Sequence, residues 1–266
     1  MLVSALALAV ASQSAAAAPT NPQVWAWDST IPTCALKHQG SPGEGTITIE
    51  RTPGNDQTEL MITLPRGSKL REGRFIDASA ATDNGRTFVA NLSTADSEMH
   101  VDSPDPEFIA SLASTSSLQI SHPKLGSVRV PINVPPAVIG TLRQCEDQTM
   151  IAWGLDPATW HNFKTRPQPV GRPLDRFTAG DYPAAALQQG VQADSIIRLD
   201  IAPDGSVSAC RALNRTSKAE DLALFKSFET VSCTVLKGAT FRPATDQAGK
   251  PVSAPIVYDV RFRLSG

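Results

Sequence analysis

The side chains of this chain that could perform chemistry are scattered histidines and one acidic segment. None of the histidines stands at a spacing typical of metal ligands; they are His38, His100, His122 and His161. The segment from His100 to Glu107 holds three carboxylates and two prolines, and such a cluster could surround a calcium ion. Carboxylates interrupted by prolines are more typical of a solvated loop, so we expect no metal site.

Motifs of the common hydrolases and nucleotide-binding proteins are also missing from the sequence. The chain has no Gly-x-Ser-x-Gly turn, no His-Glu-x-x-His helix and no phosphate-binding glycine loop. We therefore predict a protein that is not an enzyme and that takes no cofactor.

The four cysteines suit an exported protein, because disulfides form in oxidising compartments. Four cysteines allow three pairings. We favour Cys34–Cys145 and Cys210–Cys233, because each pair lies within one expected domain. In the chain-entropy model the first bond contributes at most ~4.7 kcal/mol and the second roughly 3 kcal/mol.

The composition is that of an ordinary soluble globular protein, with 41% hydrophobic and 19% charged residues. The net charge of −2 gives no electrostatic reason to bind nucleic acid or an anionic membrane.

Residues 1–18 have the pattern of a signal peptide. An apolar stretch from Leu2 to Ala11 precedes small residues from Ala15 to Ala18, which are typical of a cleavage site. An uncleaved membrane anchor is the alternative, but only about 10 residues form an unbroken apolar run and a spanning helix needs roughly 20. We expect cleavage and release into the periplasm, although no Lys or Arg precedes the apolar run.

A proline-rich segment, residues 159–173, divides the rest of the chain. It contains Pro167, Pro169 and Pro173 and lacks apolar periodicity, which predicts a stiff extended linker of at most ~50 Å. The expected domains are residues 24–158 and residues 174–266.

The first domain has the pattern of a β-rich fold. Apolar runs bounded by turn signals predict strands at residues 46–50, 60–64, 86–92, 118–120 and 128–130. Helices are expected near residues 106–113 and after Pro135-Pro136, where Val138, Leu142 and Cys145 share one helical face. We expect a sandwich-like or curled sheet closed by a helix.

The second domain is expected to follow the order helix, strand, strand, helix, strand. A short Ala-rich helix begins at Pro183 and stops at Gly190. Residues 195–201 and 207–213 predict strands joined by a tight turn. A second helix is expected from about Lys218 to Leu236, with an apolar stripe of Leu222, Phe225, Cys233 and Leu236, in which Glu229 is discordant.

This order and several residues resemble the C-terminal domain of the TonB family over about a third of the chain. The likeness rests on Tyr182-Pro183, Asp204-Gly205, Leu222 with its helix, Phe241-Arg242-Pro243-Ala244 and Gly249-Lys250-Pro251-Val252. Cys210 and Cys233 match cysteines of exported relatives. The sequence departs from the family at Gln192-Ala193, where a Gly is usual, and at Ala179-Gly180-Asp181, before Tyr182. The resemblance implies an α+β fold with an antiparallel sheet.

The resemblance also implies how a partner would bind, namely as an extended segment of an outer-membrane transporter added to the edge of the sheet. The last strand would be this edge. Its alternate residues from Ile256 to Leu264 are apolar and would face the core. The other side chains would flank the partner; they are Val257, Asp259, Arg261 and Arg263. The two arginines would pair with acidic partner residues or stay solvated.

We therefore expect a periplasmic TonB-like protein that binds a protein partner by strand addition, with a link to transmembrane transport. Because we find neither a convincing anchor nor a long proline-rich spacer, we expect binding without full energy transduction. The alternative is a cell-envelope protein whose N-terminal domain carries the function, with the TonB-like fold as an accessory. An enzyme with an unrecognised site is a third hypothesis.

Overall fold

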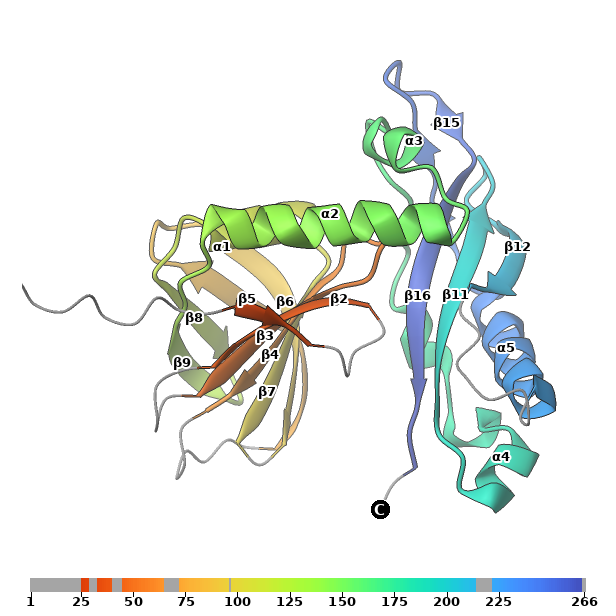
Figure 1. The fold of residues 1–266 in the computed structure, drawn as a ribbon, viewed down its shortest axis with the longest axis horizontal. Coiled ribbons are helices and arrows are strands. Elements are labelled where there is room, and N and C mark those ends of the chain that lie inside the picture. Colours follow the sequence, from red (N-terminus) through yellow and green to blue (C-terminus); the bar gives the residue numbers. More distant parts are fainter. Residues whose placement is uncertain are drawn as a thin grey trace, which may run out of the picture.

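The computed structural model describes residues 25–28, 33–39, 45–64, 72–95, 97–213 and 222–264. They form an N-terminal unit and a smaller C-terminal unit, connected by helices α2 (Pro136–Ala152) and α3 (Pro157–His161) (Figure 1). The fold is α+β, as the sequence predicts. The expected signal peptide and the expected helix start at Lys218 lie outside the described residues.

One antiparallel sheet of nine strands builds the N-terminal unit, in the order β1-β2-β3-β4-β7-β6-β5-β8-β9. The strands are β1 (Trp25–Trp27), β2 (Cys34–Gln39), β3 (Thr46–Arg51), β4 (Thr58–Thr63), β5 (Gly73–Thr82), β6 (Thr87–Ala95), β7 (Glu98–Ser103), β8 (Ser117–His122) and β9 (Gly126–Pro131). The β-rich character is confirmed. Its strands belong to one continuous sheet rather than to the two sheets of a sandwich.

The sheet curls around a single apolar core. Leu36 of β2 and Val130 of β9, near opposite ends of the sheet, lie in the same buried cluster. Helix α1 (Pro106–Leu112) adds Phe108, and α2 adds Ile139 and Leu142. Strand β4 buries every second residue, which is the period of a sheet with one covered face. The opposite face of β4 is therefore not covered by this core, and it can contact a different part of the chain.

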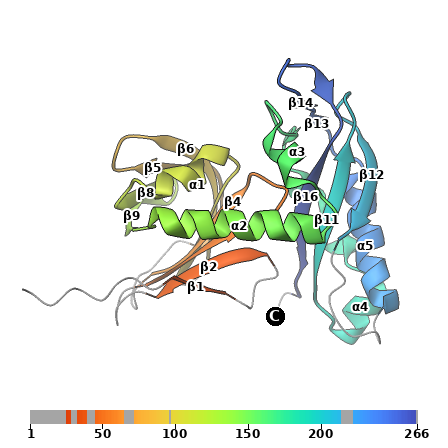
Figure 2. The ribbon, with the colours of Figure 1, turned by 45° about the horizontal axis from the view of Figure 1, so that its top comes forward.

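The C-terminal unit has a three-stranded antiparallel sheet in the order β12-β11-β16. Its elements are η1 (Pro173–Arg176), η2 (Ala179–Asp181), α4 (Ala184–Gln189), β11 (Ala193–Ile201), β12 (Val207–Ala212), α5 (Leu222–Leu236), β13 (Phe241–Arg242), β14 (Ala244–Thr245), β15 (Pro251–Val252) and β16 (Ala254–Phe262). Helix α5 covers one face of this sheet, and the end of α2 meets the opposite face (Figure 2).

The buried stripe of α5 is rotated from the predicted one. Leu222 is 59% exposed, whereas Phe228 is buried against Phe262. The discordant Glu229 lies beside β12, where its carboxylate accepts a hydrogen bond from the N–H of Ala212 at 3.2 Å. The acidic residue is tolerated on this side of the helix because it satisfies a backbone donor of the neighbouring strand.

Residues 159–173, whose prolines predict a stiff extended linker, pair along part of their length with the C-terminal unit. The N–H of Lys164 donates to Thr245 and the N–H of Val170 donates to Thr240, both at 2.9 Å. Between these contacts, β10 (Gln168–Pro169) pairs with β13. Proline keeps the segment extended, and an extended segment can also pair at a sheet edge. The composition that predicts a spacer therefore yields an added strand here.

Candidate docking site along strand β16

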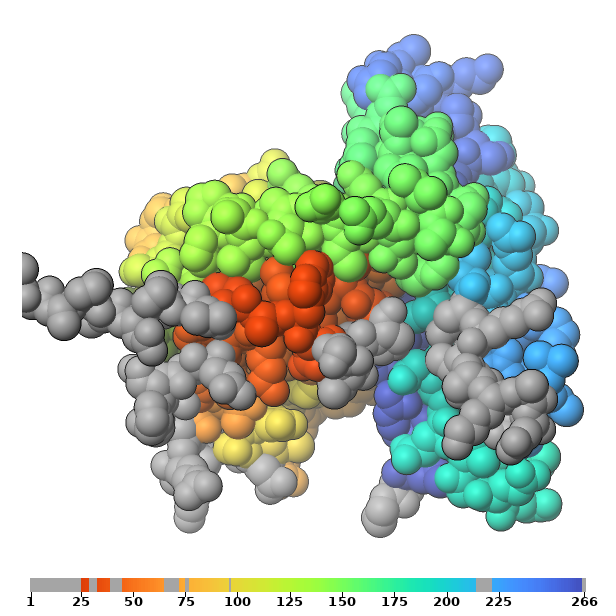
Figure 3. All heavy atoms as spheres, viewed as in Figure 1, coloured from red at the N-terminus to blue at the C-terminus, as the bar shows by residue number. Residues whose placement is uncertain are grey.

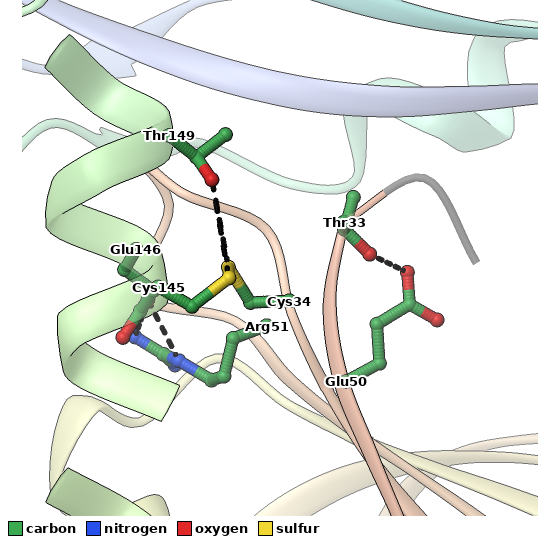
Figure 4. Close-up of a disulfide and its surroundings, with 7 residues drawn as sticks. All are labelled: Thr33, Cys34, Glu50, Arg51, Cys145, Glu146 and Thr149. Atoms are coloured by element: carbon green, nitrogen blue, oxygen red, sulfur yellow. Dashed lines mark hydrogen bonds and ion pairs between the residues drawn. A yellow bond between two sulfur atoms is a disulfide. The ribbon is translucent and has the colours of Figure 1, made fainter. Parts of the chain in front are cut away.

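Two disulfides brace the two units. Cys34 of β2 bonds to Cys145 of α2, and Cys210 of β12 bonds to Cys233 of α5, with Cα separations of 5.9 and 5.6 Å. These are the pairs favoured from the sequence. Figure 4 shows the first bond, with the hydroxyl of Thr149 at 3.8 Å from Cys34 Sγ. This bond holds α2 against the sheet.

A buried arginine next to this bond fixes the turn between β3 and β4. Arg51 forms an ion pair of 3.0 Å with Glu146 of α2 (Figure 4). Its guanidinium also donates to the carbonyls of Asp56 and Gln57, at 2.6 and 3.0 Å. The turn at residues 52–57 is thereby attached to α2, because one side chain binds both.

The tip of this turn hydrogen-bonds to the last strand of the C-terminal sheet. The N–H of Val257 donates to the carbonyl of Gly54 at 3.0 Å, and the side chain of Asn55 donates to the carbonyl of Val257 at 2.8 Å. The sequence places Val257 among the partner-binding residues. The structure corrects this, because Val257 is 0% exposed and both of its outward backbone groups are already bonded.

An apolar cluster joins the two units behind this contact. Its buried members are Met150 of α2, Leu155, Trp160 of α3, Ile196 of β11 and Val257 of β16. The guanidinium of Arg166 lies 5.2 Å from the ring centroid of Trp160 and pairs with Asp56 of the turn. The atoms of α2 form a continuous bridge between the two bodies in the space-filling view (Figure 3).

Beyond Val257, strand β16 is an edge, since among the described residues only β11 pairs with it. In an antiparallel pair, the N–H and C=O of alternate residues point to the same side. Those of Val257 point away from β11, toward the turn. The N–H and C=O groups of Asp259 and Arg261 therefore also point outward. Arg263 is the next residue with this orientation.

A cleft of about 480 Å³ runs along this edge. Strand β16 lines it from Tyr258 to Phe262. One wall is the outer face of the N-terminal sheet, with Glu50, Glu59, Asn91, His100 and Asp102. The other wall belongs to the segment before α4, with Leu174, Phe177 and Tyr182. The open part of the edge thus lies between a polar and an apolar wall.

Arg261 connects the two units across the cleft. Its guanidinium pairs with Glu50, with Glu59 at 3.5 Å and with Asp259 at 2.7 Å. Burial opposes its charged form, but these three carboxylates outweigh burial and raise the pKa of Arg261. Burial raises the pKa of Glu50 and of Asp259 in spite of the nearby arginine. The charge of Arg261 is therefore committed to groups of this chain.

The histidine of the acidic segment belongs to the same network. Burial acts to raise the pKa of Glu59, but a hydrogen bond of 2.7 Å with His100 and the charge of Arg261 outweigh it and lower this pKa. The same hydrogen bond raises the pKa of His100. Burial, followed by the charge of Glu59, raises the pKa of Asp102 to about 6.

The remainder of the acidic segment is structural. Asp105 caps α1 by accepting a hydrogen bond from the N–H of Glu107 at 2.8 Å. Over the described ranges, no group of three or more histidine, cysteine or acidic side chains could hold a metal ion.

The C-terminal unit contains its elements in the order α4, β11, β12, α5 and β16, which is the order that the sequence resemblance implies. Residues 179–264 match the family model of the Gram-negative bacterial TonB protein C-terminal. This TonB-like unit includes the edge strand β16 and leaves the nine-stranded sheet outside the match. No curated protein and no solved structure matches the chain significantly. In the described part of the chain, no helix has the length and apolar character needed to cross a membrane.

The sequence did not identify the N-terminal wall that faces the TonB-like unit. Pro53-Gly54-Asn55 is a recognisable turn signal, Glu50 is the last residue of one predicted strand, and Glu59 directly precedes the next. Alternation tells which face of a strand is polar. It does not tell whether that face meets water or a second unit.

Proposed function

We propose that this chain is an exported TonB-like protein of the bacterial cell envelope. Its TonB-like unit binds an extended segment of a protein partner by strand addition to β16, and the partner is an outer-membrane transport protein. The observation that carries the proposal is the outward direction of the backbone groups of Asp259 and Arg261 along an open cleft.

Several features support strand addition at this position. The side chains of Tyr258, Val260 and Phe262 are buried under α5, so they fix the strand without being needed by the partner. The partner would meet chiefly main-chain groups, with Asp259 and Arg261 beside it. Main-chain hydrogen bonds supply affinity in this mode, and flanking side chains supply selectivity.

Site-specific photo-crosslinking in the native envelope tests the proposal. A photoreactive residue at Arg263, which is 51% exposed in its side chain, should crosslink to an outer-membrane protein. The matched control is a photoreactive residue at Ala209, an exposed position on β12 at the opposite edge of the same sheet. Equal products at both positions, or none at Arg263, would reject docking at β16.

A second candidate function assigns binding to the N-terminal unit, with the TonB-like unit as an accessory. The extent of the family match favours it, because the larger, nine-stranded unit lies outside the matched residues 179–264. In this case, crosslinks from Val89, a position on β6 that is 62% exposed, would capture the partner, and those from Arg263 would not.

A further inference from the structure

The polar wall of the cleft carries three carboxylates in one row across neighbouring strands. Glu50 of β3 is directly opposite Glu59 of β4, and Glu59 is directly opposite Asp102 of β7. Like charges in directly opposed positions repel each other. Arg261, which reaches over from β16, pairs with the first two members of this row.

Three carboxylates at this cleft retain unused acceptor capacity. Within the described residues, Oε2 of Glu50, Oδ1 of Asp102 and Oδ1 of Asp259 are buried and have no hydrogen-bond partner. The side chains of Glu50 and Asp259 are only 2% and 6% exposed. A buried carboxylate oxygen without a donor is costly. Cationic donors from a bound segment would therefore be favourable here.

Other arginines also line the cleft, but two of them have partners elsewhere. Arg172 pairs with Asp175 at 3.1 Å, and Arg263 pairs with Asp194; neither of these aspartates lines the cleft. Arg74 is exposed on β5. Among the described residues, direct ion pairs join this row to Arg261 and His100, and the charge of Arg172 acts to lower the pKa of Asp102.

The opposite wall of the cleft is apolar. Leu174 is 37% exposed, and Phe177 and Tyr182 are partly buried with their rings against Phe262. An extended segment alternates its side chains between two sides with a period of two residues. A strand added to β16 would present one set to the carboxylates and the other set to these apolar groups.

Resting on the strand addition proposed above, we infer that the cleft recognises a protein segment in which basic and apolar residues alternate. The basic side chains lie over Glu50, Glu59 and Asp102, and the apolar side chains lie against Leu174 and Phe177. The open edge from Asp259 to Arg263 accommodates about five residues of such a segment.

The geometry also fixes which peptide groups bond to β16. Residues directly opposite Asp259 and Arg261 project their side chains to the same face, which is the acidic one. In an antiparallel addition, these residues also direct their N–H groups to β16. The basic residues would then supply the main-chain hydrogen bonds.

The experiment uses four labelled peptides and the full mature chain, with binding followed by fluorescence anisotropy. Lys-Val-Lys-Val-Lys is compared with Glu-Val-Glu-Val-Glu. Two further versions of the lysine peptide carry backbone N-methyl groups, on the lysines in one and on the valines in the other. We expect the lysine peptide to bind at least tenfold more tightly than the glutamate peptide. We also expect methylation of the lysines, and not of the valines, to abolish binding.

Variants of the protein locate the contact. Glu59→Gln and Asp102→Asn should each weaken binding of the lysine peptide roughly tenfold. The matched control is Glu107→Gln, an exposed carboxylate on α1 outside the cleft, which should leave binding unchanged. Circular dichroism of each variant verifies that it is folded.

The outcomes separate the two proposals. If the glutamate peptide binds more tightly than the lysine peptide, and backbone methylation still abolishes binding, the preference for basic residues is overturned and strand addition stands. If the lysine peptide binds with the same affinity whether its lysines or its valines are N-methylated, strand addition itself is overturned. Equal losses in the Glu107→Gln control would show nonspecific attraction and would also overturn the inference.

Discussion

The contact between Gly54 and Val257 predicts a specific coupling between the two units. Gly54 has φ of +77°, and a Cβ at this position would lie 2.8 Å from Cγ2 of Val257. Gly54→Ala therefore combines two costs. Adopting a left-handed conformation costs an L-residue about 1 to 2 kcal/mol. Overpacking a filled site costs about 1 to 3 kcal/mol more.

A second substitution removes only one of these costs. Val257→Ala deletes the methyl group that the new Cβ would strike, and alone it should destabilise the chain by about 1 to 3 kcal/mol. In the double variant the backbone strain remains and the overpacking is relieved. The double variant should therefore be more stable than the sum of the single changes predicts, by about 1 to 3 kcal/mol.

The measurement combines urea unfolding with hydrogen exchange at the Val257 amide. This amide donates to the carbonyl of Gly54, so its protection reports local separation of the two units. Protection should fall in Gly54→Ala and partly recover in the double variant. Gly190→Ala is the matched control, because Gly190 also has a positive φ of +65° but a Cβ added there would meet no atom within 4 Å. It should lose stability without changing the Val257 amide.

Two results would refute this reasoning. The first is additivity of the two substitutions within about 0.5 kcal/mol, which is typical of sites that do not touch. The second is unchanged protection of the Val257 amide in Gly54→Ala. Either result would mean that the turn at residues 52–57 does not contact β16 in solution.

Three further predictions concern the bonds around the cleft. Replacing Cys34 and Cys145 together by alanine should lower the free energy of unfolding by at most about 4.8 kcal/mol for a loop of 111 residues, as measured by urea denaturation. Arg261→Ala should cost about 3 kcal/mol near pH 8, because it leaves buried carboxylates without their cation, whereas Arg263→Ala should cost at most about 1 kcal/mol. Since the folded pKa of Asp102 is about 6, above its ordinary value of 3.8, its ionisation weakens the fold as pH rises between these values. Asp102→Asn should therefore stabilise the chain by about 2 to 3 kcal/mol near pH 8 and have no effect near pH 3, and equal gains at both pH values would contradict this assignment.

Local sequence patterns were sufficient to predict the helices and strands and the buried face of β16. Alternation from Ile256 to Leu264 correctly placed Tyr258 and Phe262 in the core, and the helical face of α2 correctly directed Cys145 inward. These features depend on neighbours within a few residues. The sequence therefore contains enough information to predict them.

The sequence was insufficient wherever two distant segments meet. Val257 has the same pattern as a solvent-facing residue of an edge strand, but Gly54 and an apolar cluster that includes Leu155 and Trp160 bury it. The stripe of α5 was misplaced for a related reason. Phe228, and not Leu222, faces Phe262, and this depends on how the helix is rotated on the sheet. Composition likewise could not reveal that residues 159–173 find an edge to pair with.

The N-terminal and C-terminal units together restrict access to the edge of β16. An exposed edge invites nonspecific pairing, and proteins restrict such edges with charges or with covering segments. Here the turn at residues 52–57 occupies the strand at Val257, and Asp259 and Arg261 place charges along the remainder. Under the proposed strand addition, a partner would have to fit a short open stretch and match a charged wall as well. The N-terminal unit would then set which segment can dock, and selectivity should therefore change when Glu59 is altered and the strand itself is left intact.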